Sequence, residues 1–280
     1  MTKVRLLTFE HLPLPAFNVP DEPWAEATWE LTQLSTWFEN YHLQHSPQDF
    51  LRDLETVNAA VGGRIVSAKS DVAPEEPDDT LKDLPFVALH CVSDSGSSEW
   101  PDEFASYVNH LAGLKRDGDE AVTIVTAIHG YQRDFPEFDS AVQDCEVRVP
   151  LWLMGANMTP ALRTSNLAGS RDLLRTINQL LDVNIPPEDD GPSRSIDLRE
   201  LMLGSKQQDR RMPLYVKDKA AIRTLEFLFV RDQDFHTSLY AKPTDVWNVH
   251  DVSGEFHDVV DELDAVVSSA VGSQNTPAEQ

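Results

Sequence analysis

Short apolar runs alternate with amphipathic segments along the first two thirds of the chain, and this alternation constrains the fold more than any other feature. The runs have the length and the β-branched or leucine-rich composition of buried strands, and they span residues 4–9, 64–68, 85–90, 121–126 and 149–154. Helical patterns separate them at residues 24–41, 47–62, 102–115 and 170–182. Strands that alternate with helices predict an α/β fold, with a central, largely parallel sheet flanked by helices on both faces.

Two of these helices carry specific expectations. In the first, apolar residues recur at three-, four- and seven-residue spacings, which is typical of one helical face; they are Trp24, Leu31, Leu34, Phe38 and Tyr41. In the last, Ser170 precedes an apolar periodic segment. A serine at that position is a favourable N-cap, so we expect the helix to begin after it.

The pattern changes in the last third of the chain. Residues 184–195 are rich in proline and acid and predict a linker. Residues 222–230 and 238–242 then predict a β-hairpin, and residues 255–270 predict a helix. We therefore expect an α/β core over 1–195, a small α+β subdomain over 196–270, and a disordered tail over 271–280.

The chain of 280 residues is strongly acidic, with 47 acids, 23 bases and a net charge of −24. This charge repels nucleic acid and anionic lipid, so neither is an expected partner. It also repels anionic esters unless a cation or a local basic group offsets it. The N-terminus lacks a signal-peptide pattern and no apolar run is long enough to span a membrane, which predicts a cytoplasmic protein. The two cysteines, Cys91 and Cys145, are expected to be buried thiols.

The chain resembles, over nearly its full length, a sulfatase of the alkaline phosphatase superfamily, and five segments in the family's order carry the resemblance. They match the family's I-V-T-S-D-H-G strand, R-V-P-L strand, D-L-L-P-T-L-L helix, A-I-R-T strand and closing L-Y segment, and they span residues 121–130, 147–153, 167–183, 221–224 and 238–252. The resemblance implies the sulfatase fold in a shortened member. It also implies sulfate ester hydrolysis by a formylglycine, made within C/S-x-P-x-R, beside a divalent cation held by strand-end carboxylates.

The sequence departs from that pattern at each functional position. The first strand should end in paired aspartates, but Glu10 is the one carboxylate there. Ile128 takes the aspartate's place in the second motif, while His129 and Gly130 persist. Where the nucleophile motif is expected, Ser46 precedes a proline but lacks the spacing and the arginine. Arg133 could contact a sulfate, although its context does not match the family. Glu10, His90, Ile128 and His129 therefore mark a vestigial site without a catalytic residue.

Two hypotheses follow. The first is a sulfatase-like pseudoenzyme that needs no cofactor and binds a protein or a small anionic ligand. The second is a hydrolase of sulfate or phosphate esters whose rebuilt site, formed by Glu10, His90 and His129, holds calcium, magnesium or zinc.

Other interpretations have less support. His42 and His45 could share a metal, but unrelated polar side chains at a helix end are the simpler interpretation. No G-x-S-x-G, P-loop or G-x-G-x-x-G motif occurs, which leaves acyl-hydrolase and nucleotide-binding activities unsupported.

Overall fold

The computed structural model describes most of the chain. It covers residues 2–12, 23–44, 46–69, 83–92, 102–116, 118–129, 147–155, 158–184, 194–202, 210–214, 216, 218–245 and 248–274. His45, Gly130, Arg133, Cys145 and the C-terminal end of the predicted tail lie outside the described residues.

A seven-stranded sheet forms the centre of the larger unit, in the order β3-β4-β1-β5-β6-β2-β7. Strands β3, β4, β1 and β5 are parallel neighbours, as are β2 and β7, while β6 runs antiparallel to both β5 and β2. The largely parallel sheet is therefore confirmed. The strands are β1 (Val4–His11), β2 (Thr36–His42), β3 (Arg64–Lys69), β4 (Phe86–Val92), β5 (Val122–His129), β6 (Leu151–Met154) and β7 (Leu162–Gly169).

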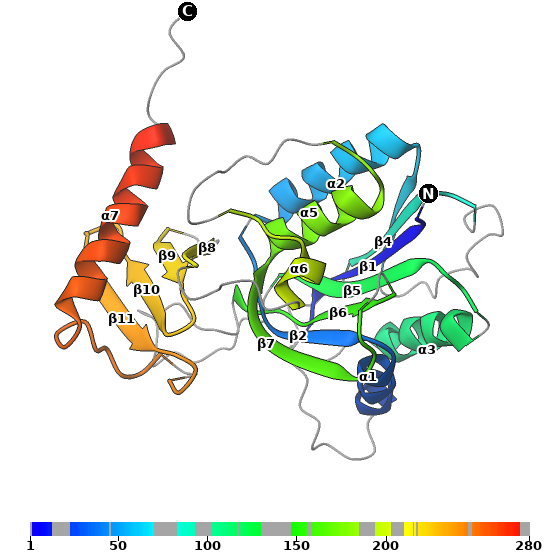
Figure 1. The fold of residues 1–280 in the computed structure, drawn as a ribbon, viewed down its shortest axis with the longest axis horizontal. Coiled ribbons are helices and arrows are strands. Elements are labelled where there is room, and N and C mark those ends of the chain that lie inside the picture. The colour runs from blue at the N-terminus through cyan, green and yellow to red at the C-terminus, as the bar shows by residue number, and fades with distance from the viewer. Residues whose placement is uncertain are drawn as a thin grey trace, which may run out of the picture.

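Helices cover both faces of this sheet, as predicted (Figure 1). Helices α1 (Pro23–Leu34) and α3 (Asp102–Arg116) lie on one face, where Phe9 of β1 packs against Phe104 at a centroid distance of 5.4 Å. Helices α2 (Pro47–Val61) and α5 (Ser170–Leu180) lie on the other. The short α6 (Leu198–Met202) packs against α5 and β7.

The first predicted helix is wrong beyond Leu34. Residues 36–42 form β2, which pairs with β6 and β7 in the sheet. The aromatic spacing in this segment also fits a strand, because Trp37 and Phe38 are buried on opposite faces of the sheet. Pairing with two neighbouring strands decides the conformation over local helical periodicity.

Two further differences concern β7 and the helix that follows it. The sequence pattern missed β7, whose Arg163, Thr164, Ser165 and Asn166 make it too polar to be predicted as a buried strand. The N-cap of α5 is Gly169 rather than Ser170. Ser170 is the first helical residue, and its Oγ accepts a hydrogen bond from the backbone N–H of Gln44 (2.9 Å).

The C-terminal unit contains an antiparallel sheet in the order β11-β10-β9-β8, together with α7 (His257–Gln274), which extends into the predicted tail. The run predicted as one strand over 222–230 is two strands, because the chain turns where Thr224 N–H bonds Phe227 O (2.9 Å). The hairpin of β10 and β11 is as predicted. The strands are β8 (Met212–Leu214), β9 (Ala220–Arg223), β10 (Phe227–Arg231) and β11 (Thr237–Ala241).

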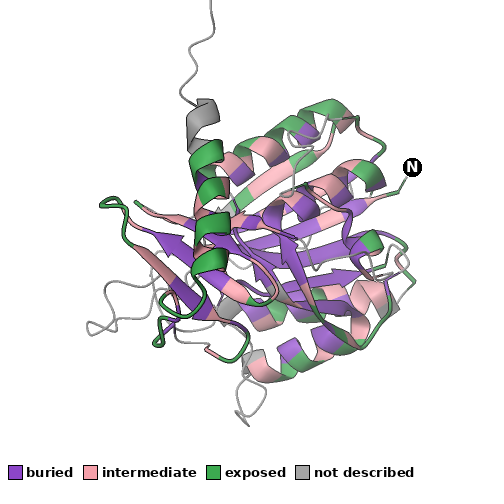
Figure 2. Cartoon of the chain, turned by 60° about the vertical axis from the view of Figure 1, so that its left-hand side comes forward, coloured by how far each residue is buried: buried purple, intermediate pink, exposed green. Residues whose placement is uncertain are grey.

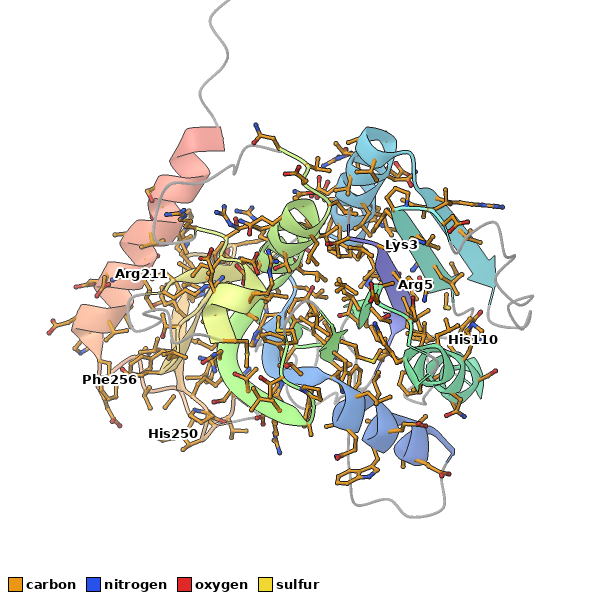
Figure 3. All side chains as sticks on the ribbon, turned by 45° about the vertical axis from the view of Figure 1, so that its right-hand side comes forward. Lys3, Arg5, His110, Arg211, His250 and Phe256 are labelled. Carbon is orange, nitrogen blue, oxygen red and sulfur yellow. The ribbon has the colours of Figure 1, made fainter. Side chains whose placement is uncertain are left out.

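The small sheet has apolar side chains on both faces. One face packs under α7, whose outer surface is exposed (Figure 2), and Arg211 next to β8 pairs with Glu262 of α7 (Figure 3). The other face shares a cluster with Val147 and Leu167 of the larger unit. Leu198 and Leu201 of α6 belong to the core of the seven-stranded sheet. No described helix is long and apolar enough to cross a membrane.

Candidate functional site

The carboxyl edge of the seven-stranded sheet is where the family resemblance places a site. Strands β1, β4 and β5 are parallel and end together at this edge, where β2 and β7 also end and α2 and α5 begin. In Figure 1 the amino end of β1 lies at the right and the four-stranded sheet lies at the left, beyond the opposite edge. Carboxyl edges of parallel sheets are the usual position of ligand sites in α/β folds.

The strand register separates the predicted residues into two sets. Thr8 pairs with both His90 and Thr126, and His11 pairs with His129. Paired residues point to the same face and consecutive residues to opposite faces. Glu10, His90 and Ile128 therefore share the face that α2 and α5 cover. His129 points to the other face, on which Phe9 packs against α3.

His90 is the most constrained polar group at these strand ends. Its Nδ1 lies 3.1 Å from the Thr8 hydroxyl, and the residue is only 7% exposed. Burial lowers the pKa of the His90 imidazole, while the nearby Glu10 carboxylate acts in the opposite direction. Burial therefore favours the neutral form of the His90 imidazole, and the contact with Thr8 orients its ring.

Ile128 is 3% exposed and belongs to the core of the larger unit. A divalent cation at this edge would need several converging oxygen or nitrogen ligands. The residues present do not fit, because a hydrocarbon stands beside Glu10 and the two histidines diverge. Across the described parts of the chain, three potential ligands come together at one place, Asp232, Asp234 and His236 in the β10–β11 turn.

Pro47, at the start of α2, lies where the sequence resemblance leads us to expect the nucleophile motif. Ser46 caps this helix, because its Oγ accepts a hydrogen bond from Asp49 N–H (3.1 Å) and Pro47 is the first helical residue. Counting back from Pro47, the nucleophile position of C-x-P-x-R corresponds to His45, and the arginine position corresponds to Asp49. The Asp49 carboxylate accepts hydrogen bonds from the Ser46 hydroxyl (2.7 Å) and from Arg52 (2.6 Å). The sequence signal for this alignment of C-x-P-x-R was Pro47. It was missed because Ser46 was considered as the candidate nucleophile.

A second polar cluster at the same edge was not predicted. The Asp172 carboxylate in α5 accepts hydrogen bonds from the backbone N–H groups of Gly169 and Ile196, both at 2.7 Å. Arg210 donates to both of its oxygens at 2.6 Å and to Leu167 O at 2.8 Å. Burial raises the pKa of Asp172, and the Arg210 guanidinium opposes that shift. This ion pair joins the segment that enters β8 to the start of α5.

His42 and Arg148 form a third polar pair at this edge. The two residues lie directly opposite each other, framed by backbone hydrogen bonds from Leu43 N–H to Val147 O (2.8 Å) and from Val149 N–H to Tyr41 O (3.1 Å). His42 is buried, whereas Arg148 is partly exposed. The proposed partner of His42, His45, lies outside the described residues, as does Arg133.

Comparisons with known proteins define the fold. No family model matches the sequence, and no curated protein matches it. Solved structures do match. The structure of Ps i-CgsB in complex with k-i-k-neocarrahexaose aligns with a TM-score of 0.70 and 12% identity, over 96% of this chain and 92% of that one.

Two further structures match at similar levels. The PsFucS1 sulfatase from Pseudoalteromonas sp. has a TM-score of 0.67 and 11% identity, over 100% of this chain and 92% of that one. BT4656 in complex with D-glucosamine-2-N,6-O-disulfate has a TM-score of 0.65 and 9% identity, over 100% and 99%. The chain thus has the fold of sulfatases and other alkaline phosphatase superfamily proteins, which is what the sequence resemblance implies.

Proposed function

We propose that this chain is a sulfatase-like protein that binds a ligand without catalysing hydrolysis. Ile128 carries the proposal, because a buried hydrocarbon occupies the strand end at which the family places a metal-binding aspartate. Ile128 cannot ligate an ion, and a carboxylate in its place would be buried beside Glu10. Without a cation, no described residue at the ends of β1, β4 and β5 offsets the charge that develops on a sulfate or phosphate oxygen during hydrolysis.

The ligand class we propose is a small anionic molecule, such as a sulfated sugar. Two observations support it: one structural neighbour is solved in complex with D-glucosamine-2-N,6-O-disulfate, and ligand sites of α/β folds usually lie at the carboxyl edge of the sheet. Fold kinship supports the location more strongly than the chemistry, since function resides in the side chains. The alternative ligand in this proposal is a partner protein, bound in place of a small anionic molecule.

A hydrolase with a rebuilt site is the competing function. It needs Glu10, His90 and His129 to converge on one ion, and the strand register directs His129 to the opposite face from the other two. Two ligands from one face are fewer than the three protein ligands of known catalytic zinc sites. The competing function is therefore the weaker candidate.

Metal titration separates these two functions. Isothermal calorimetry of the purified protein with calcium, magnesium and zinc should show no site that depends on Glu10 or His129. Tight binding of one equivalent of any of these ions, abolished in both Glu10→Gln and His129→Ala, would support the hydrolase instead. His236→Ala is the control variant, because it removes a ligand from the other potential cluster, in the β10–β11 turn.

A further inference from the structure

We propose that Arg148 is the residue that binds the charged group of an oxyanion ligand, namely a sulfate or phosphate ester, at the carboxyl edge. This inference rests on the proposed binding function and names the residue and the ligand chemistry. Arg148 lies three residues before β6, which runs antiparallel to β5 and lies two strands away from β1 in the sheet order. It therefore lies at the same edge as Glu10 and His90.

The hydrogen bonding of Arg148 is incomplete. Its Nε is buried and has no acceptor among the described residues, and the side chain pairs with no described carboxylate. Five other arginines in the second half of the chain pair with a described carboxylate, namely Arg163, Arg199, Arg210, Arg211 and Arg231. Arg175 in α5 has the same unpaired Nε, so Arg148 is distinguished by its position at the carboxyl edge rather than by the missing pair alone. A buried guanidinium nitrogen is stabilised by a charged acceptor.

The surroundings of Arg148 place it at the junction of the two units. His42 is its direct cross-strand neighbour, so both side chains project from the same face. Tyr41, the residue before His42, lies near Asp172 and Thr126 on the face that α5 covers. His42 and Arg148 are therefore on the opposite face. On that face, a Cβ added to Gly169, the β7 partner of His42, would lie 2.8 Å from Met212 Sδ of β8.

A junction between two units at the carboxyl edge is a common position for a small-molecule site. Arginine suits this role, because its planar fork matches the geometry of a sulfate or phosphate group. It also supplies the local positive charge that an acidic chain needs before an anion can approach.

Calorimetric binding of D-glucosamine-2-N,6-O-disulfate, with inorganic sulfate as a second probe, tests the inference. Arg148→Gln should weaken binding by about tenfold or more, whereas Arg148→Lys, which keeps the charge, should weaken it less. Arg175→Gln is the matched control, since Arg175 in α5 is also partly buried with an unpaired Nε. It should bind like the unmodified protein.

The outcomes are distinguishable. Unchanged binding by a folded Arg148→Gln, or equal losses in the Arg148 and Arg175 variants, would overturn the assignment to Arg148 while leaving the binding function in place. Absence of binding by the unmodified protein would overturn the proposed ligand class together with this inference. If Arg148→Gln does not fold, Arg148→Lys decides: it must bind more weakly than the unmodified protein. Binding of inorganic sulfate alone would show that the sugar contributes nothing to recognition.

Discussion

Two polar clusters lie at the carboxyl edge of the large sheet, one around Asp172 and one around Glu10 and His90. They differ in how completely their polar groups are hydrogen-bonded. Asp172 is fully buried, and its two oxygens accept four hydrogen bonds, two of them from Arg210. Closer to the centre of the sheet, Glu10 and His90 share their surroundings with the hydrocarbon of Ile128. The first cluster is a complete structural ion pair. The second cluster contains His90, which contacts the Thr8 hydroxyl, and Glu10, but it lacks the ligand set that a metal needs. A polar side chain at the carboxyl edge is therefore not functional by its position alone. The groups that it contacts say more about its role.

The largest effect should come from breaking the complete cluster. Asp172→Ala leaves the Arg210 charge buried without its partner, so we expect a loss of about 3–5 kcal/mol in the free energy of unfolding, measured with urea. Arg163→Met is the control, because Arg163 pairs with Glu39 at the surface and should cost no more than about 1 kcal/mol. Similar losses in the two variants would show that the Asp172–Arg210 pair is not special.

The backbone beside this cluster should be the next most sensitive position. A Cβ added at Gly169 would lie 2.0 Å from Gln44 Oε1 and 2.8 Å from Met212 Sδ. Gly169→Ala should therefore cost about 1–3 kcal/mol by overpacking. Gly113→Ala in α3 meets nothing within 4 Å and should stabilise the protein by about 0.5–1 kcal/mol. Thermal unfolding checks both, and a Gly169→Ala protein as stable as the parent would contradict the packing at this junction.

Ile128 should behave as a core residue. Ile128→Val removes one buried methylene and should cost about 0.5–1.5 kcal/mol, with no change in ligand affinity. Urea unfolding and calorimetry measure the two quantities on the same protein. A change in affinity without a change in stability would mean that Ile128 contacts the ligand. The strand ends around Ile128 would then form a binding site rather than part of the core.

The smallest effect concerns the pH dependence of stability. The pKa of His90 in the folded protein is lowered from 6.5 by burial, so the unfolded chain takes up its proton at a higher pH than the folded one. The contribution of His90 is therefore fully present above about pH 6.5 and is lost as the pH falls through the folded-state value. His90→Gln should unfold with a shallower loss between pH 7 and pH 5. Parallel pH profiles for the two proteins would rule out a buried, neutral His90.

Much of the fold could be predicted because the strands that occupy the centre of the sheet carry strong local patterns. The apolar runs of β1, β4 and β5 specify buried strands wherever they pair. The pattern failed at residues 36–42, where aromatic spacing fits a helix and a strand equally and the partners β6 and β7 decide. It failed again at β7, which is polar over its middle residues.

The strand ends that carry the candidate site could be predicted from the sequence, whereas the side-chain contacts formed there could not. Consecutive strand residues point to opposite faces, so the strand pattern alone is enough to separate Ile128 from His129. The pairing of Asp172 with Arg210 could not be predicted, since 38 residues separate them and no local pattern connects them. Nor does the sequence alone distinguish Arg148 from the arginines that are already paired, because the distinction depends on which carboxylates lie nearby in the folded chain.

Turnover is the most direct test of the central claim that the chain binds without hydrolysis. Release of 4-nitrophenol from its sulfate and phosphate esters should be measured with added calcium, magnesium or zinc, using the purified unmodified protein and His129→Ala. The account predicts no release above the uncatalysed rate in either protein with any of the ions. Turnover by the unmodified protein that is lost in His129→Ala would contradict it and establish an active hydrolase.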